Sequence, residues 1–360
     1  MNDTQKAGVE SRMAPLARVE RFSRAVFLAS GADEATADAA TRAMLHASRL
    51  GVDSHGIRLL DHYVTAIAGG RVNGRPTLRL EEDGGAVCRL NADHAHGALA
   101  TYRAMDRAIE LADRFGIGAV SIRDSSHFGA AGAYALHAAR RGFIGLAVCN
   151  SDSFVRLHDG ASRFHGTNPI AFGVPVSGDN PWLLDMATSA IPYNRVKLYE
   201  SLARPLPEGT ASDAHGIDTT HPSEAEMLAP LGAAFGFKGA GLAGLVEILS
   251  AVLSGMTLSF DILPMGGPDM ATPRGLGAFV LAMKPGAFVP EETFNAGMAR
   301  YLEGLRTSPA RAGTQVLAPG DREWQVAALR DRDGIPLDPA TLQAFHRFAE
   351  RHGIPLPFEE

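Results

Sequence analysis

The sequence predicts an α/β protein with two domains. Three observations lead to this prediction. The 360 residues exceed the usual length of one domain, both ends of the chain have helical periodicity, and strands alternate with helices in its middle. We expect a mainly helical domain formed by both termini, residues 15–75 together with 290–360. Residues 76–289 are expected to form a domain built on a mixed sheet.

Helices account for the two ends of the chain. Asp33 is a suitable N-cap, and Gly69-Gly70 is a stop signal. The helices predicted for the ends cover residues 19–28, 34–50, 59–68, 291–306 and 339–352.

The middle of the chain alternates short apolar runs with helical segments. A stretch rich in Pro, Gly, Asp and Thr, residues 200–222, is predicted to be a long surface loop. The predicted strands cover residues 86–90, 118–122, 144–149, 182–186 and 277–283. The helices predicted between them cover residues 98–115, 133–141 and 240–256.

The composition excludes several classes of partner. A formal net charge of −6 without a basic run argues against nucleic acid or an anionic membrane surface as the main partner. No uninterrupted apolar run reaches transmembrane length. Cys88 and Cys149 lie in apolar, strand-like runs, which favours buried thiols in a reducing compartment. We therefore expect a cytoplasmic protein.

The most informative stretch of the sequence runs from Asp124 to Tyr134 and contains one imidazole, His127. It lies between a predicted strand and a predicted helix, so His127 is expected at a strand-to-helix turn, near the positive end of a helix dipole. A histidine there can bind an anion or move a proton near neutral pH. The alternative is that His127 only caps the helix.

Four further strings accompany this one, and together the five resemble the malate/L-lactate dehydrogenase family of the second type. The strings are Asp53-Ser54-His55-Gly56-Ile57, Gly166-Thr167-Asn168-Pro169-Ile170-Ala171-Phe172-Gly173, Asp185-Met186-Ala187-Thr188-Ser189 and Gly236-Phe237-Lys238-Gly239-Ala240-Gly241. The resemblance implies a homodimer that transfers a hydride between NAD or NADP and a small 2-hydroxy or 2-oxo carboxylate, such as malate, lactate or sulfolactate. It also implies a non-Rossmann dinucleotide-binding domain, and this chain has no convincing G-x-G-x-x-G fingerprint.

Two versions of the family's chemistry differ in the histidine that moves the proton. In the hydroxyacid enzymes the residue matching His127 accepts the proton, beside the residue matching Asp152. In the reductases of cyclic imino acids the residue matching His55 donates it, through Ser54 and a more distant Asp. That Asp corresponds to Arg195 here. The sequence therefore favours alcohol oxidation, with imine reduction as the alternative. A second alternative is an inactive binding protein that retains the fold.

The resemblance also implies binding residues. The family's carboxylate-binding Arg is displaced by one position to Arg58, which we still expect to face the active site, with Arg274 and Arg195 as substitutes. Tyr63 and Thr167 are further candidates for the substrate. The positions expected to contact the cofactor are His127, Phe128, Gly129, Ser151, Asp185, Met186, Ala187, Lys238, Gly320 and Asp321.

The other histidines do not predict a metal site. His94-Ala95-His96 lacks a partner Cys or Glu at ligand spacing, so it is interpreted as an exposed loop. The histidines expected on the surface are His46, His62, His137 and His158.

Overall fold

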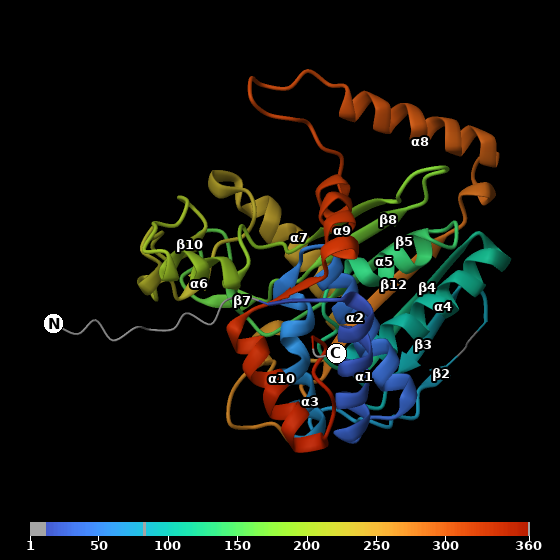
Figure 1. Cartoon of the computed structure of the whole chain (residues 1–360). Coiled ribbons are helices and arrows are strands. Elements are labelled where there is room, and N and C mark those ends of the chain that lie inside the picture. The colour runs from blue at the N-terminus through green and yellow to red at the C-terminus, as the bar shows by residue number, and fades with distance from the viewer. Residues whose placement is uncertain (1–11, 82–83, 359–360) are drawn as a thin grey trace.

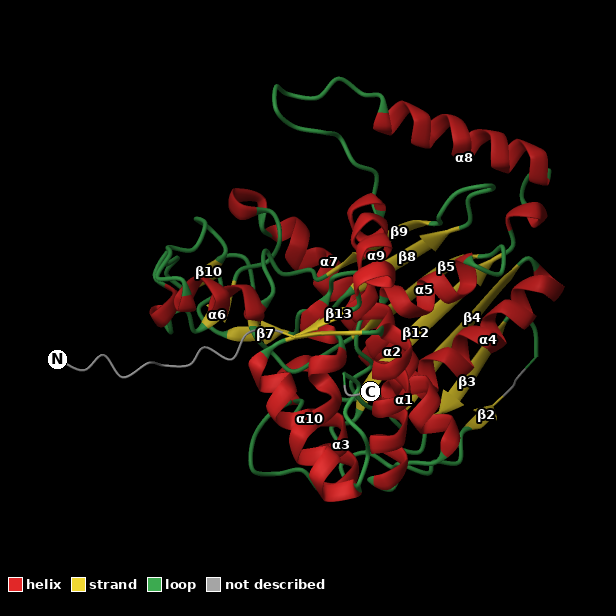
Figure 2. Cartoon of the chain, viewed as in Figure 1, coloured by secondary structure: helices red, strands yellow, loops and turns green. Residues whose placement is uncertain are grey.

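A mixed sheet of seven strands forms the centre of the molecule (Figure 2). The computed structural model describes residues 12–81 and 84–358. Neighbouring strands are antiparallel except β3 and β4, which are parallel. In spatial order the strands are β2 (Arg79–Glu81), β3 (Val87–Asn91), β4 (Ile117–Ser125), β12 (Leu276–Met283), β5 (Ile144–Cys149), β8 (Ile170–Val174) and β9 (Trp182–Met186).

The two faces of this sheet are covered by different helices, because side chains alternate along each strand. Val120, Ala147 and Val280 point to one face and pack under α4 (Gly97–Phe115) and α5 (Gly132–Ala139). Val148 and Phe279 point to the other face and pack under α7 (Phe237–Glu247). A π-helical turn, Ile248–Val252, follows α7 directly.

Helices from both ends of the chain form a second core in front of α4 and α5 (Figure 1). Large side chains such as Phe22, Phe27, Met44 and Phe345 fill this core. The short strands β1 (Arg12–Ala14) and β13 (Ile335–Leu337) pair antiparallel and join the two ends. The helices that contribute are α1 (Leu16–Ala29), α2 (Glu34–Arg49), α3 (Leu60–Gly69) and α10 (Pro339–His352).

Three further parts surround these cores. A small sheet in the order β10, β11, β6, β7 lies beside α6 (Tyr193–Ser201), and α9 (Asp321–Asp333) packs on α2. Helix α8 (Glu291–Arg306) stands away from the body in Figure 1, and Leu302 is its buried residue. The small-sheet strands are β6 (Val155–Arg156), β7 (Arg163–His165), β10 (Ala211–Ser212) and β11 (Met227–Leu228).

The α/β class and the mixed sheet are confirmed, and the sequence missed several elements. β8 was not predicted because its run contains a glycine and follows a proline, and α9 because its sequence is polar with only Ala327 fully buried. The Asp33 N-cap is confirmed, since its carboxylate accepts a hydrogen bond of 2.8 Å from the Thr36 amide. The division into two domains stays a prediction. α8, which was assigned to the helical domain, does not enter the core that the two termini share.

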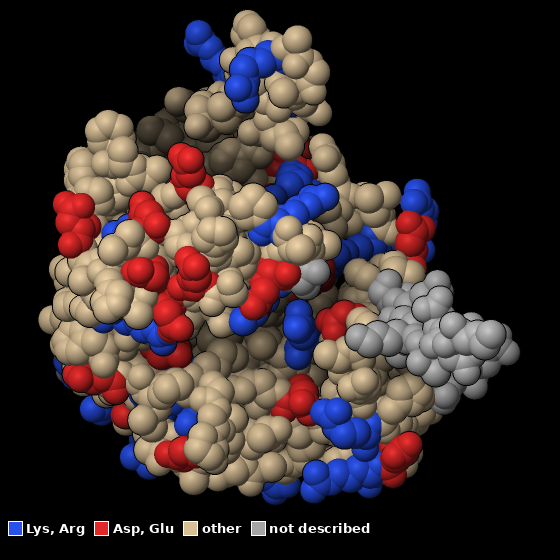
Figure 3. Space-filling model, turned by 90° about the vertical axis from the view of Figure 1, so that its left-hand side faces the viewer, with Lys and Arg blue, Asp and Glu red and all other residues tan. Residues whose placement is uncertain are grey.

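The face of the molecule seen in Figure 3 has no dominant charged patch. Lys and Arg alternate with Asp and Glu over the face seen in Figure 3. None of the helices in residues 12–81 and 84–358 is both long enough and apolar enough to cross a membrane.

Candidate active site

His127 lies where the sequence placed it, in the connection between β4 and α5. This connection is tightly held. The Ser126 hydroxyl donates to the Ala95 carbonyl and accepts from the Gly97 amide, each at 3.0 Å. A side chain at Gly97 would meet the backbone of residues 126 and 127, so only glycine allows α4 to begin this close. The backbone of His127 is therefore fixed by the start of the neighbouring helix.

Tyr63 from α3 orients the imidazole of His127. The Tyr63 hydroxyl lies 2.8 Å from Nδ1 of His127, and among the described residues Nε2 has no hydrogen-bonding partner. The Tyr63 ring in turn packs edge-on against His96, with centroids 4.2 Å apart. If Nδ1–H donates to the Tyr63 oxygen, Nε2 is the basic nitrogen and is left available to a bound molecule.

His55 lies beside His127, which brings the two sequence candidates into one site. Their rings stack with centroids 5.9 Å apart and an interplanar angle of 20°. The Ser54 hydroxyl lies 2.9 Å from Nδ1 of His55. Gly129, with φ of +79°, borders the same space, because a Cβ there would lie 3.7 Å from the Tyr63 hydroxyl oxygen and 3.8 Å from the His55 carbonyl oxygen. Gly129 therefore brings the backbone within contact distance of both residues.

Burial keeps both imidazoles neutral. It lowers the pKa of His127 well below its ordinary value, and the charges of His55, Arg274 and His62 lower that pKa further. Burial also lowers the pKa of His55, and it raises the pKa of the Tyr63 phenol. At neutral pH, His127 is therefore an unprotonated base and Tyr63 a neutral hydroxyl.

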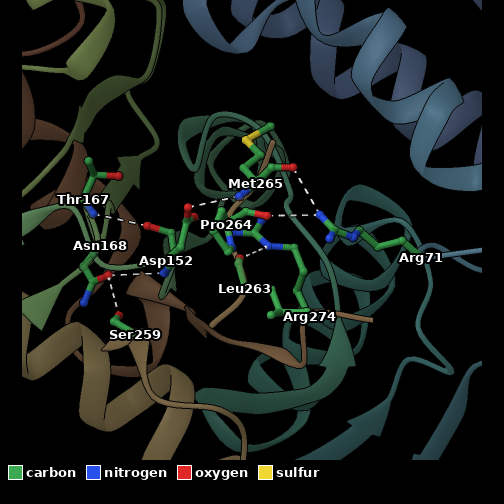
Figure 4. Close-up of polar contacts among 10 residues, drawn as sticks. Arg71, Asp152, Thr167, Asn168, Ser259, Leu263, Pro264, Met265 and Arg274 are labelled. Carbon is green, nitrogen blue, oxygen red and sulfur yellow. Dashed lines mark hydrogen bonds and ion pairs between the residues drawn. The ribbon is translucent and has the colours of Figure 1, made fainter. Parts of the chain in front are cut away.

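Arg274 is a buried cation in this site, and its guanidinium is only partly satisfied. Its Nε donates to the Leu263 carbonyl at 2.8 Å and its Nη2 pairs with Asp152 (Figure 4). Its Nη1 is buried and has no partner among residues 12–81 and 84–358. Asp152 also accepts a hydrogen bond of 3.1 Å from the Met265 amide. Arg71 binds the carbonyls of Pro264 and Met265 at 3.1 and 3.2 Å, which fixes the loop that Arg274 follows.

Two expected contacts are wrong. Asp152 does not pair with His127, because the guanidinium of Arg274 and the Met265 amide take its two oxygens. Arg58 does not face the active site. Its side chain is 56% exposed and its Nε lies 3.9 Å from Asp338. Residues Ile57–Leu59 form a 3₁₀ turn in which Ile57 is buried, so the next side chain turns outward.

The expected cofactor positions occupy the end of β9 and the helix starts around it. The Ser151 hydroxyl accepts a hydrogen bond of 3.2 Å from the Thr167 amide, and Phe128 is buried. Asp185 accepts one of 2.9 Å from the Gly132 amide, and burial raises its pKa to about 6. Met186 and Ala187, which follow Asp185, are half-buried.

The remaining cofactor candidates differ in the contacts that they already make within the protein. Lys238 is exposed in the first turn of α7, with its ammonium 5.3 Å from the centre of the Phe235 ring. Gly320 is the N-cap of α9 in a left-handed conformation, with φ of +97°. Asp321 binds Arg306 of α8 at 2.7 Å, so its carboxylate already has a cation.

The sequence missed two groups of residues near this site. His96 was assigned to an exposed loop, but it is buried and accepts a hydrogen bond from the Ala98 amide as the N-cap of α4. Its place just before a predicted helix was the available signal. Glu247 is also buried and accepts hydrogen bonds from Asn168 at 2.8 Å and from the Ser259 amide at 2.7 Å, which holds the Thr167-Asn168 turn. Among the described residues, no three His, Cys, Asp or Glu side chains are placed to hold a metal.

Comparisons of the whole sequence with known proteins point to one family. A sequence model of the family described as malate/L-lactate dehydrogenase matches residues 14–346. The chain is 32% identical to a malate dehydrogenase of Pyrococcus abyssi, over 97% of this chain and 98% of the relative. It is 34% identical to ureidoglycolate dehydrogenase (NAD(+)) of Escherichia coli, over 77% and 78%. It is 36% identical to (2R)-3-sulfolactate dehydrogenase (NADP(+)) of Chromohalobacter salexigens, over 82% and 86%.

Solved structures show the same fold. A malate dehydrogenase from Entamoeba histolytica superposes with a TM-score of 0.91 at 27% identity, covering 97% of this chain and all of that one. A delta1-piperideine-2-carboxylate reductase from Pseudomonas syringae superposes with a TM-score of 0.82 at 28% identity, covering 94% and 100%. Both hydroxyacid and imine chemistry therefore occur on this fold.

Proposed function

The chain belongs to the malate/L-lactate dehydrogenase family, and on that premise we propose that it transfers a hydride between NAD or NADP and a small 2-hydroxy carboxylate. The observation that carries the proposal is the pair formed by His127 and Arg274. A neutral imidazole with an available Nε2 lies within the electrostatic influence of a buried guanidinium that has an unsatisfied nitrogen. The substrate class needs these two groups, one for its hydroxyl proton and one for its carboxylate.

His127 acts as the proton acceptor in alcohol oxidation. Its Nε2 takes the hydroxyl proton as the carbinol hydride leaves, and it returns the proton in the reverse direction. Tyr63 fixes the ring, because its oxygen accepts a hydrogen bond from the Nδ1–H of the reactive tautomer. His55, 5.9 Å away and held by Ser54, provides a second polar wall of the pocket.

Arg274 binds the substrate carboxylate in place of Arg58. Its Nη1 is buried and unpartnered, whereas Arg58 is exposed beside Asp338. A buried guanidinium donor without an acceptor is costly, and an incoming carboxylate removes that cost. Asp152 holds the guanidinium in place from the opposite side, which makes it a positioning residue.

The residues around β9 fit a dinucleotide. Gly129 lies beside Tyr63 and His55, and Lys238 has no carboxylate partner among the described residues. Lys238 would pair with a phosphate, and the half-buried Met186 and Ala187 would line the cofactor's path. When bound, NAD or NADP supplies the hydride acceptor, and the protein positions it and excludes water.

This chain lacks one residue that the imine reductase mechanism needs. The residue matching its relay Asp is Arg195, which is exposed on α6. A cation there gives no proton to His55. His55 keeps its Ser54 contact in this chain, so imine substrates remain the necessary comparison in any assay.

We further propose that the chain works as a homodimer in the cytoplasm. One face of α7 and of the π-helical turn after it consists of exposed, large apolar side chains at helical spacing. These are Leu242, Leu245, Ile248 and Val252. Such a contiguous apolar face is unusual on a monomer and suits a second copy. Cys88 and Cys149 are buried, and neither forms a disulfide among the described residues, as expected in a reducing compartment.

The test is an absorbance assay of nicotinamide reduction. The protein is mixed with NAD⁺ or NADP⁺ and malate, lactate, sulfolactate or ureidoglycolate, and with the reduced cofactors and cyclic imino acids. We expect turnover of a 2-hydroxy carboxylate, and a loss of about 10²–10⁴ in kcat for His127→Asn with unchanged cofactor affinity. Turnover of imines alone, lost in His55→Asn and kept in His127→Asn, would replace the proposal with the reductase. No turnover despite cofactor binding would indicate an inactive binding protein.

A further inference from the structure

A second cavity lies in front of α5, away from His127 and Arg274. It has a volume of about 500 Å³ and opens between α1, α2 and α5. α5 presents Ala133, Leu136 and Arg140 to it, while Ala135 of the same helix packs against the sheet at Gly173. The apolar face of α7 lies on the other side of the sheet, so a partner bound to that face leaves this cavity open.

The cavity is lined by four arginines, Arg24, Arg42, Arg49 and Arg140, and by two carboxylates, Glu20 and Asp38. Arg24 pairs with Asp38 at 2.5 Å. Arg49 pairs with Asp331 at 2.5 Å. Arg42 stacks over the Tyr102 ring at 4.1 Å and contacts His137, and it has no ion pair among the described residues. Arg140 likewise has no ion pair or hydrogen bond from its side chain in the described part of the chain.

Like charges are held close together here. The pKa of Arg140 is lowered by burial and by the charges of Arg49 and Arg42. Burial and these three arginines lower the pKa of His46 to about 3, so His46 is neutral and adds no charge. Asp106 and Asp331 act on the cluster from its edges, and Arg141 adds a cation beside Asp106. Among the described residues, Arg42 and Arg140 are therefore the arginines of this cavity that lack a carboxylate partner.

A buried hydroxyl gives an independent sign of a missing ligand. Thr41 of α2 lines the cavity and is 2% exposed, and its Oγ1 has no hydrogen-bonding partner in the part of the chain that the structure describes. Buried polar groups in native proteins are almost always satisfied. Leu45, Leu50 and Leu136 form an apolar floor beside it, which suits the carbon part of a ligand.

We propose that this cavity binds a small organic anion with at least two negative charges, either a phosphate ester or a polycarboxylate. Arg42 and Arg140 would take the anionic groups, because guanidinium forks match both phosphate and carboxylate oxygens. Thr41 would donate its hydroxyl to the same ligand. The assignment does not depend on the dehydrogenase activity, since none of His55, Tyr63, His127 and Arg274 lines the cavity.

Calorimetric titration of the full chain at low salt tests this assignment. The probes are inorganic pyrophosphate, a sugar monophosphate and citrate, and NAD⁺ and NADP⁺ are titrated separately. We expect at least one anion to bind, and Arg140→Gln to weaken it about tenfold or more, as for a lost charged hydrogen bond. Phosphates binding without citrate, or citrate without phosphates, identifies the ligand class.

Two further variants make the result specific. Thr41→Val keeps the side-chain volume, and we expect it to weaken binding about threefold to tenfold without lowering the melting temperature of the unliganded protein. Arg103→Gln, an exposed arginine on α4 that does not line the cavity, is the control and should bind normally. No binding of any anion would overturn the proposal, as would binding that Arg140→Gln and Thr41→Val leave unchanged. Competition between pyrophosphate and NAD⁺, with NAD⁺ affinity lost in Arg140→Gln, would instead make the cavity part of the cofactor site.

Discussion

Arg274→Gln is the most direct test of how the active site recognises its substrate. The substitution keeps an amide donor but removes the charge and the fork of the guanidinium. Loss of a charged hydrogen bond costs about 1.5–3 kcal/mol, which corresponds to an increase in KM of about 10- to 100-fold. Nη1 of Arg274 is buried and has no partner among the described residues, so we expect the lost hydrogen bond to be one to the substrate carboxylate.

The same substitution changes the pH dependence. The positive charge of Arg274 lowers the pKa of His127, so removing it raises that pKa toward 6.5. His127 must be neutral to accept a proton, and activity therefore falls as the pH drops through its pKa. We expect the acid limb of kcat/KM to move to higher pH in Arg274→Gln, measured by initial rates at saturating cofactor.

Matched variants separate recognition from folding. Asp152 loses its cation in Arg274→Gln, so the double variant Arg274→Gln/Asp152→Asn, which removes both charges, should fold while retaining the high KM. Arg58→Gln is the control, because Arg58 is exposed, and its KM should be normal. A normal KM in Arg274→Gln together with a high KM in Arg58→Gln would refute the assignment of the carboxylate to Arg274.

Three other expectations concern single side chains. Tyr63→Phe removes the oxygen at Nδ1 of His127, so kcat should fall while the cofactor Kd stays unchanged; a normal kcat would show that Tyr63 does not select the tautomer. Lys238→Ala should raise the cofactor Kd and leave the substrate KM nearly unchanged, measured by fluorescence titration, and an unchanged Kd would remove Lys238 from the site. His96 has its pKa lowered to about 3 by burial, so the unfolded chain binds a proton below pH 6.5 that the folded chain does not, and stability falls as the pH drops. His96→Asn, which keeps an N-cap oxygen, should recover about 2 kcal/mol of the stability lost between pH 7 and pH 5 in denaturant titrations. An unchanged pH dependence would contradict this.

The sequence predicted the parts of the site that depend on local pattern. The apolar run of β4 and the alanine-rich α5 placed His127 in a strand-to-helix connection, because each element is defined by residues near it in the chain. Ser54 and His55 were adjacent in the sequence and remain in contact.

Contacts between distant segments were not predictable in this way. Tyr63 and His127 are 64 positions apart, and Asp152 and Arg274 are 122 positions apart. Resemblance placed Asp152 near His127 but gave no information about a buried cation competing for the same carboxylate. The error at Arg58 has a local cause, since a 3₁₀ turn and an α-helix direct the next side chain differently.

The arrangement of charge around His127 leads to a final prediction about when this base becomes strong. In the free protein, burial and the charge of Arg274 lower its pKa, which makes His127 a weak base. A substrate carboxylate bound to Arg274 neutralises that charge and adds a negative group near the imidazole. Both changes favour the protonated imidazole and therefore raise the pKa of His127. Desolvation by the substrate opposes this change, and we expect the electrostatic effect of the carboxylate to be the larger of the two. At saturating NAD⁺ or NADP⁺, the acid limb of kcat should therefore lie at higher pH than that of kcat/KM, and the gap should shrink in Arg274→Gln. A kcat limb at the same or lower pH would mean that the carboxylate does not bind at Arg274.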